Sequence, residues 1–255
     1  MTSHFMSVLR QAFKTFDRAN LASFNSNLQH LKQLTDQLTY RDLHIKEELF
    51  REVIDSVDSV RSAPCTYMHI FEDERFSMSL FIVRGGNSIP LHDHPMMYGL
   101  LRCLWGKLHV QSYSQLLAAD DPLTYDTNPT LVKVIAEEPC LVTTETSSAL
   151  LTPRKRNYHQ ITQAGSGSED GNGIAAFFDI LSPPYDANMP IFGPRRCRFY
   201  RPNSESQSLA DHLELQCIPS PSSYYCDLTD TPKSVLQCGF ICAAEAFAVN
   251  VTDVQ

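Results

Sequence analysis

The stretch Gly86-Asn-Ser-Ile-Pro-Leu-His92-Asp-His94-Pro95 decides how this sequence is interpreted. Successive side chains of a β-strand point to opposite faces, so His92 and His94 would project together while Asp93 faces the other way. Two imidazoles on one face of a strand can coordinate a single metal ion. The glycine pair at the start of the stretch suits a tight turn into that strand.

The His-x-His pair alone does not identify a metal site, because chance supplies about 0.3 such pairs in a chain with this histidine content. Two histidines on a polar barrel face explain it equally well. Two observations favour a metal: Gly99 and Gly106 follow at the spacing of barrel corners, and His159 lies in a later strand-like segment. A lone histidine, however, is more often a hydrogen-bonded structural residue. The remaining histidines have no partner at ligand spacing, and His109 is expected to face outward.

Short β-prone runs surround the motif from Cys65 onward, and clusters of Gly, Pro, Asn and Asp separate them. Many short strands without intervening helices are typical of a β-sandwich or a barrel. The predicted strands are Thr66–Phe71, Phe76–Val83, Leu100–Tyr113, Leu131–Ile135, Ala149–Thr152, Tyr158–Thr162, Ile174–Leu181 and Cys197–Arg201.

The first sixty residues have helical periodicity instead. Apolar residues recur at helical spacing over residues 5–16 and again over residues 28–38. Thr39–Asp42 resembles a capping box that would precede a third helix, Ile45–Val60. We therefore expect a helical arm packed on a larger β body.

Length and composition fit a single overall domain with three parts. These are a helical arm (1–62), a β core (63–201) and a C-terminal extension (202–255) whose structure the sequence does not define. The formal net charge of −8 argues against a nucleic-acid partner. No segment has the apolar run of a secretory signal or the ~18 to 20 apolar residues of a membrane span. The scattered cysteines are expected to be reduced thiols of a cytoplasmic protein.

Several motifs together resemble a known family. The pattern Gly86-x5-His92-x-His94-x4-Gly99-x6-Gly106 is similar to the first cupin motif. Ile89–Pro95 followed by Leu104–Val110 resembles the cysteamine dioxygenase and plant cysteine oxidase family. Asn157–Ile161 matches that family's third-histidine motif, and Asp179–Tyr185 matches its downstream block. The N-terminal helices look like the animal branch.

The resemblance implies a cupin double-stranded β-helix barrel in which His92, His94 and His159 hold Fe(II). It further implies a thiol dioxygenase that uses O2 to convert an aminothiol, either cysteamine or a protein N-terminal cysteine, to its sulfinic acid. We expect a monomer. Ligand type alone leaves Zn, Cu and Ni open as well as Fe. A non-catalytic or differently metallated cupin that binds a small ligand is the alternative.

Asp179 and Tyr185 are the catalytic residues that we expect outside the metal shell. Asp179 follows two phenylalanines in an apolar strand, where a carboxylate needs a partner. That partner would be the substrate amine, a metal-bound histidine or backbone amides. Tyr185 follows two prolines that fix the chain direction. Its hydroxyl would meet the substrate, or its ring would pack at the barrel rim.

Two residues depart from the family pattern. Met96 stands where glycine is common after His-Asp-His-Pro, which implies a bulkier wall beside the metal. Phe199 stands where the animal branch has a tyrosine, two residues after Cys197. A Cys–Tyr cross-link at that place is therefore not carried over to this chain.

Overall fold

The structure is a computed structural model that describes residues 3–19, 21–55, 62–118, 120–165, 173–187, 193–203 and 212–252. The helices are α1 (His4–Thr15), η1 (Leu21–Ser23), α2 (Phe24–Asp36), α3 (Glu47–Asp55) and α4 (Lys233–Thr252). The strands are β1 (Cys65–Glu72), β2 (Ser77–Arg84), β3 (Ser88–Asp93), β4 (Tyr98–Trp105), β5 (Lys107–Gln115), β6 (Leu131–Ala136), β7 (Cys140–Thr143), β8 (Ala149–Leu151), β9 (Tyr158–Gln163), β10 (Ile174–Ser182), β11 (Phe199–Pro202), β12 (Leu213–Ile218) and β13 (Cys226–Leu228).

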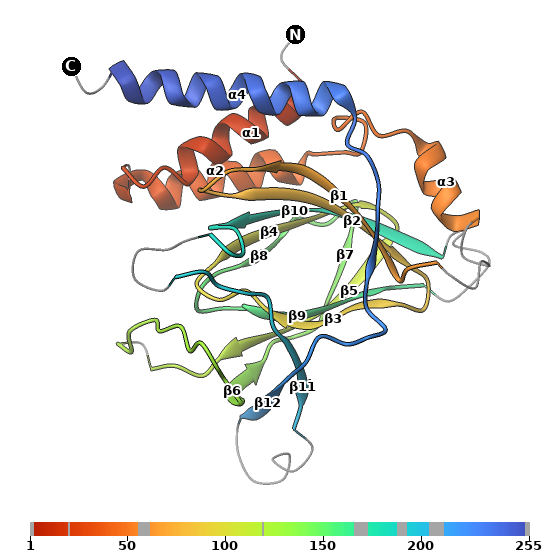
Figure 1. The fold of residues 1–255 in the computed structure, drawn as a ribbon, viewed down its shortest axis with the longest axis vertical. Coiled ribbons are helices and arrows are strands. Elements are labelled where there is room, and N and C mark those ends of the chain that lie inside the picture. Colours follow the sequence, from red (N-terminus) through yellow and green to blue (C-terminus); the bar gives the residue numbers. More distant parts are fainter. Residues whose placement is uncertain are drawn as a thin grey trace.

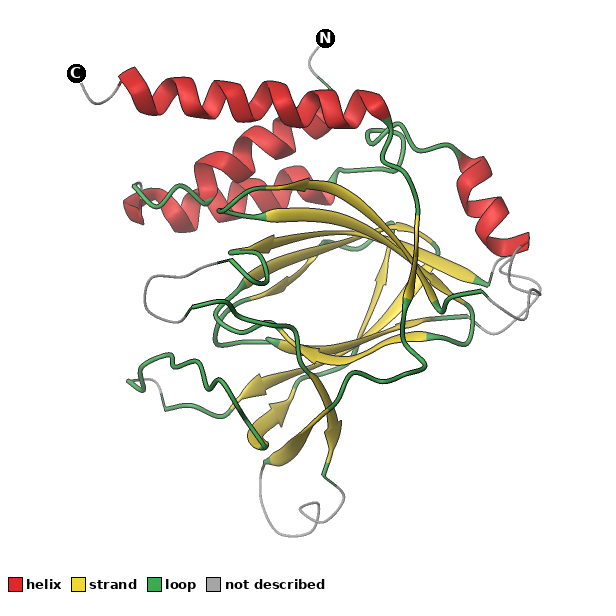
Figure 2. Ribbon diagram, viewed as in Figure 1, coloured by secondary structure: helices red, strands yellow, loops and turns green. Residues whose placement is uncertain are grey.

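Two sheets face each other across the body of the protein (Figures 1 and 2). The first has the strand order β13-β1-β2-β10-β4-β8, and the second has the order β6-β12-β11-β3-β9-β5-β7. Strand β6, at one edge of the second sheet, also pairs with β5 near the other edge, so this sheet curls round and closes on itself. Neighbouring strands are antiparallel except β1 and β13. The architecture is mainly β and confirms the expected cupin double-stranded β-helix barrel with its N-terminal helices.

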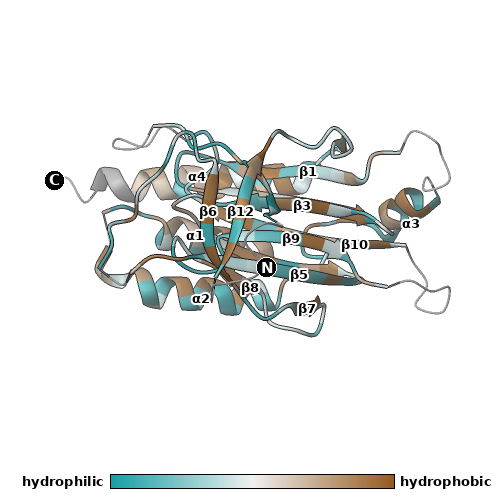
Figure 3. Ribbon diagram, turned by 90° about the horizontal axis from the view of Figure 1, so that it is seen from below, coloured by the Kyte–Doolittle hydropathy of each residue, from teal (hydrophilic) through white to brown (hydrophobic). Residues whose placement is uncertain are grey.

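Helices α1, α2 and α4 cover the outer face of the first sheet (Figure 1). Strand β10 is buried along its whole length because both of its faces are covered, one by the helices and the other by the second sheet. Phe178 points to the helices and meets Phe5 of α1 with ring centroids 6.4 Å apart. Phe177 belongs to the interior cluster between the sheets. The covering helix α2 alternates hydrophobic and hydrophilic positions, as Figure 3 shows.

The C-terminal residues, which the sequence left undefined, pair with the barrel and the arm. Strand β12 lies between β11 and β6, and β13 extends the first sheet beside β1. Helix α4 packs on α1, where Arg10 and Glu245 form an ion pair at 2.7 Å. Among the described residues, no helix is long and apolar enough to cross a membrane. The division of the chain at 62 and 201 remains a prediction.

Three details differ from the sequence-based expectations. The single strand predicted over Leu100–Tyr113 is wrong, because Gly106, at φ +68°, turns the chain from β4 in one sheet to β5 in the other. Gly99 is not at a corner but inside β4, where a Cβ would come within 2.8 Å of Leu151. The third helix is shorter than Ile45–Val60: it covers Glu47–Asp55, and residues 56–60 lie outside the described residues.

The turn at Gly106 gives a test of the fold. Gly86 and Gly106 both have positive φ, but only at Gly106 would a Cβ meet backbone, 2.6 Å from the Ile174 carbonyl oxygen. Gly86→Ala should therefore lower the free energy of unfolding only by the cost of the strained backbone, about 1 kcal/mol. Gly106→Ala should lower the free energy of unfolding by roughly 2 kcal/mol more than Gly86→Ala, because the clash with the Ile174 carbonyl oxygen adds to the backbone cost. Urea unfolding of both variants measures the difference, and equal losses would contradict the described corner.

Candidate metal centre

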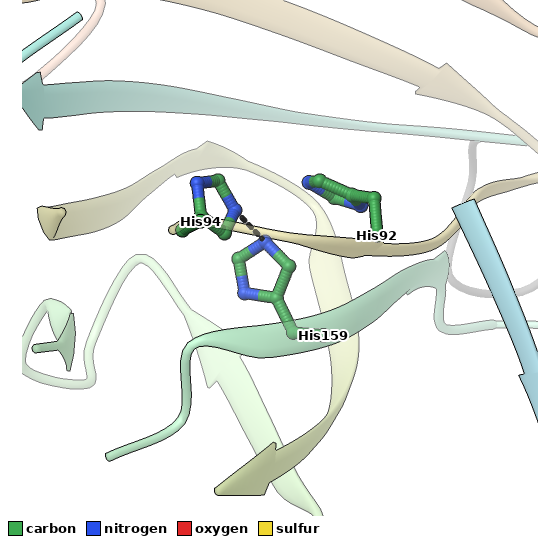
Figure 4. A group of neighbouring side chains, drawn as sticks. All are labelled: His92, His94 and His159. Atoms are coloured by element: carbon green, nitrogen blue, oxygen red, sulfur yellow. Dashed lines mark hydrogen bonds between the residues drawn. The ribbon is translucent and has the colours of Figure 1, made fainter. Parts of the chain in front are cut away.

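Strands β3 and β9 bring three histidines together between the sheets (Figure 4). The two strands are antiparallel neighbours, and His92 on β3 is the direct partner of His159 on β9. His94 is the first residue after β3 and lies on the same side as His92, while Asp93 points to the opposite face. The predicted alternation across the His-x-His pair is confirmed, and His109 is exposed as expected.

The three imidazoles converge on one point. The Nε2 atoms of His94 and His159 are 2.9 Å apart, and the ligand atoms of all three lie within 4.8 Å of one another. Two nitrogens bound to one ion at about 2.1 Å and roughly at right angles would lie about 3.0 Å apart. The His94–His159 pair already has that separation. All three side chains are buried.

Hydrogen bonds fix which ring nitrogen of each β3 histidine faces the centre. His92 Nδ1 lies 2.8 Å from the Pro90 carbonyl oxygen, an acceptor, so this nitrogen carries the proton. The Tyr185 hydroxyl donates to the Asp93 carbonyl oxygen at 2.5 Å and lies 2.8 Å from His94 Nδ1. Since that hydroxyl hydrogen is used, His94 Nδ1–H donates to the hydroxyl oxygen. Both rings therefore present the Nε2 lone pair to the centre.

Burial keeps these imidazoles neutral. Desolvation lowers the pKa of His92 to about 4 and lowers the pKa values of His94 and His159 well below their ordinary range. The neighbouring histidines lower the last two pKa values further. Neutral imidazole is a good ligand for Zn, Cu, Fe and Ni, and a poor one for the oxygen-seeking Mg and Ca. The donor set thus fits a transition-metal ion.

The opposite face of β3 is tied down by Asp93. Its carboxylate accepts hydrogen bonds from the Arg198 backbone N–H at 2.8 Å and from the Tyr200 hydroxyl at 2.9 Å. The Asp93 N–H donates in turn to the Arg198 carbonyl oxygen at 3.1 Å. Burial raises the pKa of Asp93 to about 6 despite these donors. The strand that carries two histidines is therefore held by polar contacts from β11 and the residue before it.

A cavity of about 110 Å³ opens over the histidines. All five residues predicted for the site line it: His92, His94, His159, Asp179 and Tyr185. Apolar side chains from both sheets form most of the remaining wall, namely Phe81, Ile89, Ile161, Phe177, Leu181 and Phe199. An ion and a small substrate in this cavity would be largely shielded from water.

Asp179 is the acidic group of this cavity. It comes from β10 in the sheet opposite the histidines, and burial raises its pKa to about 7. A hydrogen bond from the Ile180 backbone N–H lowers the pKa in part. Among the described residues no cation forms an ion pair with it. A carboxylate in this position favours a cationic ligand, because an ion pair with the ligand offsets the cost of burying the charge of Asp179.

Sequence reasoning missed several residues of the site, because long connections bring them there. Cys197 and Tyr224 line the cavity, and the Cys197 thiol hydrogen-bonds the Tyr185 hydroxyl. Burial raises the pKa of Cys197 to about 12. Arg195, fully buried, donates to the Pro95 carbonyl oxygen at 2.8 Å and to that of Pro184 at 3.0 Å. The guanidinium thus joins the segments that follow β3 and β10.

The prediction that Met96 makes the wall beside the metal bulkier is wrong. Met96 does not line the histidine cavity but a second cavity on the other face of β3, together with Asp93 and Tyr158. Its backbone φ is +63°, a conformation that glycine adopts without strain. The preference for glycine at this position therefore has a backbone cause.

Comparisons with known proteins agree on one family. The family described as PCO_ADO matches residues 34–236. The chain is 31% identical to 2-aminoethanethiol dioxygenase of Mus musculus over 254 residues, which covers 89% of this chain and 94% of that protein. It is 32% identical to the Homo sapiens protein of the same name over 227 residues, covering 80% and 79% of the two chains. Identity to plant cysteine oxidase 2 of Arabidopsis thaliana is 28% over 178 residues, covering 68% and 56%.

The contact between Tyr185 and His94 gives a test of the centre. Tyr185→Phe removes the acceptor of the His94 Nδ1–H, and loss of such a partner lowers metal affinity by roughly 10- to 100-fold. Tyr40→Phe is the matched control, because the Tyr40 hydroxyl donates to Glu47 in the helical arm. Competition with a chelator of known affinity measures the metal dissociation constant of both variants. Equal affinities would show that the Tyr185 hydroxyl does not position His94.

Proposed function

Since the chain belongs to the PCO_ADO family, we propose that it is a thiol dioxygenase acting on an aminothiol, either cysteamine or an N-terminal cysteine. The observation that carries the proposal is one small cavity with three convergent neutral imidazoles on one wall and a buried carboxylate on the opposite wall. The reaction adds both atoms of O2 to the substrate sulfur and gives a sulfinic acid.

We propose Fe(II) as the metal, held by His92, His94 and His159. When bound, it would supply adjacent positions for the thiol sulfur and O2 and the electrons that activate O2. Three neutral ligands leave the full positive charge of the ion in place, which favours loss of the thiol proton. The protein contributes chiefly by holding the two reactants close together.

The apolar wall and Asp179 account for substrate choice. Phe81, Phe177 and Phe199 exclude water from the reacting sulfur. We propose that Asp179 receives the ammonium group of the substrate. An ammonium beside Asp179 favours the ionised carboxylate, so the raised pKa falls when the substrate binds. The relatives named 2-aminoethanethiol dioxygenase and plant cysteine oxidase act, by their names, on thiols that carry an amine.

Tyr185 takes a positioning role in this proposal. Its hydroxyl holds His94 and the Asp93 carbonyl, so it orients a metal ligand rather than the substrate. Cys197 contacts the same hydroxyl from inside the cavity.

We further propose that the protein works as a monomer in the cytoplasm. The eight cysteines are all free thiols, as is usual in a reducing compartment. The monomeric state would be read from sedimentation of the full chain.

The reaction itself is tested with labelled oxygen. Under 18O2, the Fe(II)-loaded protein should convert cysteamine or a Cys-initiated peptide to a sulfinic acid carrying two labelled oxygens, as measured by mass spectrometry. Unlabelled O2 in labelled water is the control and should leave the product unlabelled. N-acetylation of the peptide should abolish turnover, because the ammonium group is lost. Disulfide as the sole product, or equal rates on the acetylated peptide, would contradict the proposal.

Asp179→Asn separates substrate recognition from folding. The variant should retain its iron and melting temperature, yet lose binding of an aminothiol by roughly 10-fold or more, since a buried charge pair is lost. Binding of a thiol without an amine, such as 2-mercaptoethanol, should change little. In the wild type, amine binding should weaken as pH falls through 7, because protonation neutralises Asp179.

The KM values of the two thiols, measured from about pH 6 to about pH 8 on either side of the Asp179 pKa of about 7, test this effect. A variant that loses both thiols equally, or that melts earlier with normal KM values, would identify Asp179 as a structural residue.

A further inference from the structure

Strands β1 and β13 place Cys65 and Cys226 directly opposite each other. They are Cα partners in the parallel pairing of these strands. Registered partners point their side chains to the same face of a sheet, and adjacent strands are about 4.8 Å apart. Disulfides need a Cα–Cα distance of about 4.4 to 6.8 Å. The backbone of this strand pair therefore already suits a disulfide.

The two thiols are in contact as well. The Cys65 thiol hydrogen-bonds the Cys226 sulfur, and the Thr66 carbonyl oxygen is a second acceptor at 3.6 Å. This contact lowers the pKa of Cys226 and raises the pKa of Cys65 well above its ordinary value. Cys65 is fully buried, whereas Cys226 is half-buried on the edge strand. Cys226 is thus the accessible, more readily ionised member of the pair.

We propose that Cys65 and Cys226 form a reversible disulfide, with a small disulfide such as glutathione disulfide as the oxidant. The Cys226 thiolate attacks one sulfur of glutathione disulfide and releases one glutathione, which leaves a mixed disulfide on Cys226. The Cys65 thiol loses its proton and attacks the Cys226 sulfur, which releases the second glutathione. Two protein thiols are oxidised to one disulfide, and glutathione disulfide is reduced to two glutathiones.

The disulfide would reach the wall of the histidine cavity. Tyr224, two residues before Cys226, lines that cavity, and its hydroxyl lies 3.7 Å from the Cys226 sulfur, which donates to it. Oxidation removes that S–H donor and fixes β13 against β1. The Tyr224 ring lies 5.9 Å from the ring of Phe199, which also lines the cavity. A change in KM on oxidation is therefore expected; this consequence rests on the proposed function, whereas the disulfide does not.

Equilibration of the full chain in glutathione buffers of increasing oxidised fraction tests the bond. After acid quenching, alkylation and digestion, mass spectrometry should find the peptides of Cys65 and Cys226 joined, with loss of two hydrogens and of alkylation at both. The melting temperature should rise by about 5 to 15 °C on oxidation, because the bond closes a long loop. Cys226→Ser and Cys65→Ser should lose both effects. Cys140→Ser, a half-buried cysteine of the same interior cluster, should keep them.

Cys65→Ser changes a fully buried side chain and can impair folding, whereas Cys226→Ser changes only a half-buried one. Cys226→Ser therefore tests the disulfide even if Cys65→Ser does not fold. Full alkylation of Cys65 and Cys226 in the most oxidising buffer, or linkage of either one chiefly to another cysteine, would overturn the inference. Neither readout needs turnover. A joined peptide in a protein that fails the 18O2 test would refute the proposed function and leave the disulfide standing.

Discussion

The pairing of β3 with β9 is the constraint on which the rest of this structure depends. It sets His92 opposite His159, and the alternation along β3 adds His94 to the same side. Because the site is buried, the imidazoles are neutral. Their ring nitrogens converge on one point, and the Nε2 atoms of His94 and His159 are 2.9 Å apart. A shift of one residue in the register would turn the histidines away from the cavity and bring Asp93 into it.

The polar groups around the site hold this register. Asp93 on the outer face of β3 binds Arg198 and Tyr200, so the strand that carries two histidines cannot slide without breaking these bonds. On the inner face, Tyr185 joins His94 to the backbone of β3. Both sheets contribute apolar side chains to the cavity, and the first sheet adds one carboxylate, Asp179, opposite the imidazoles. In the proposed function, the second sheet therefore holds the metal ion and the first sheet binds the substrate amine.

Local patterns predicted what depends on local geometry. Strand alternation was enough to put His92 and His94 on one side, and the apolar run of β10 was found as a strand. The role of His159 needed the family resemblance, because no spacing rule connects a residue 65 positions after His94 to the same site. The places of Cys197 and Tyr224 in the cavity, and strand β12, were not predicted, because only tertiary contacts bring these segments to the site and the barrel. Gly106 was expected at a barrel corner and lies at one, where its positive φ suits glycine. The strand prediction nevertheless ran through it, because the apolar pattern continues from β4 into β5.

The metal content of the protein after anaerobic loading with Fe(II) and removal of excess ion tests the central claim most directly. Elemental analysis would compare the wild type, the alanine variants of His92, His94 and His159, and His109→Ala, whose side chain is exposed on the neighbouring strand β5. We expect stoichiometric iron in the wild type and in His109→Ala, and loss of iron in the other three variants while the barrel stays folded. Stoichiometric iron in a folded alanine variant of any of the three histidines would contradict it.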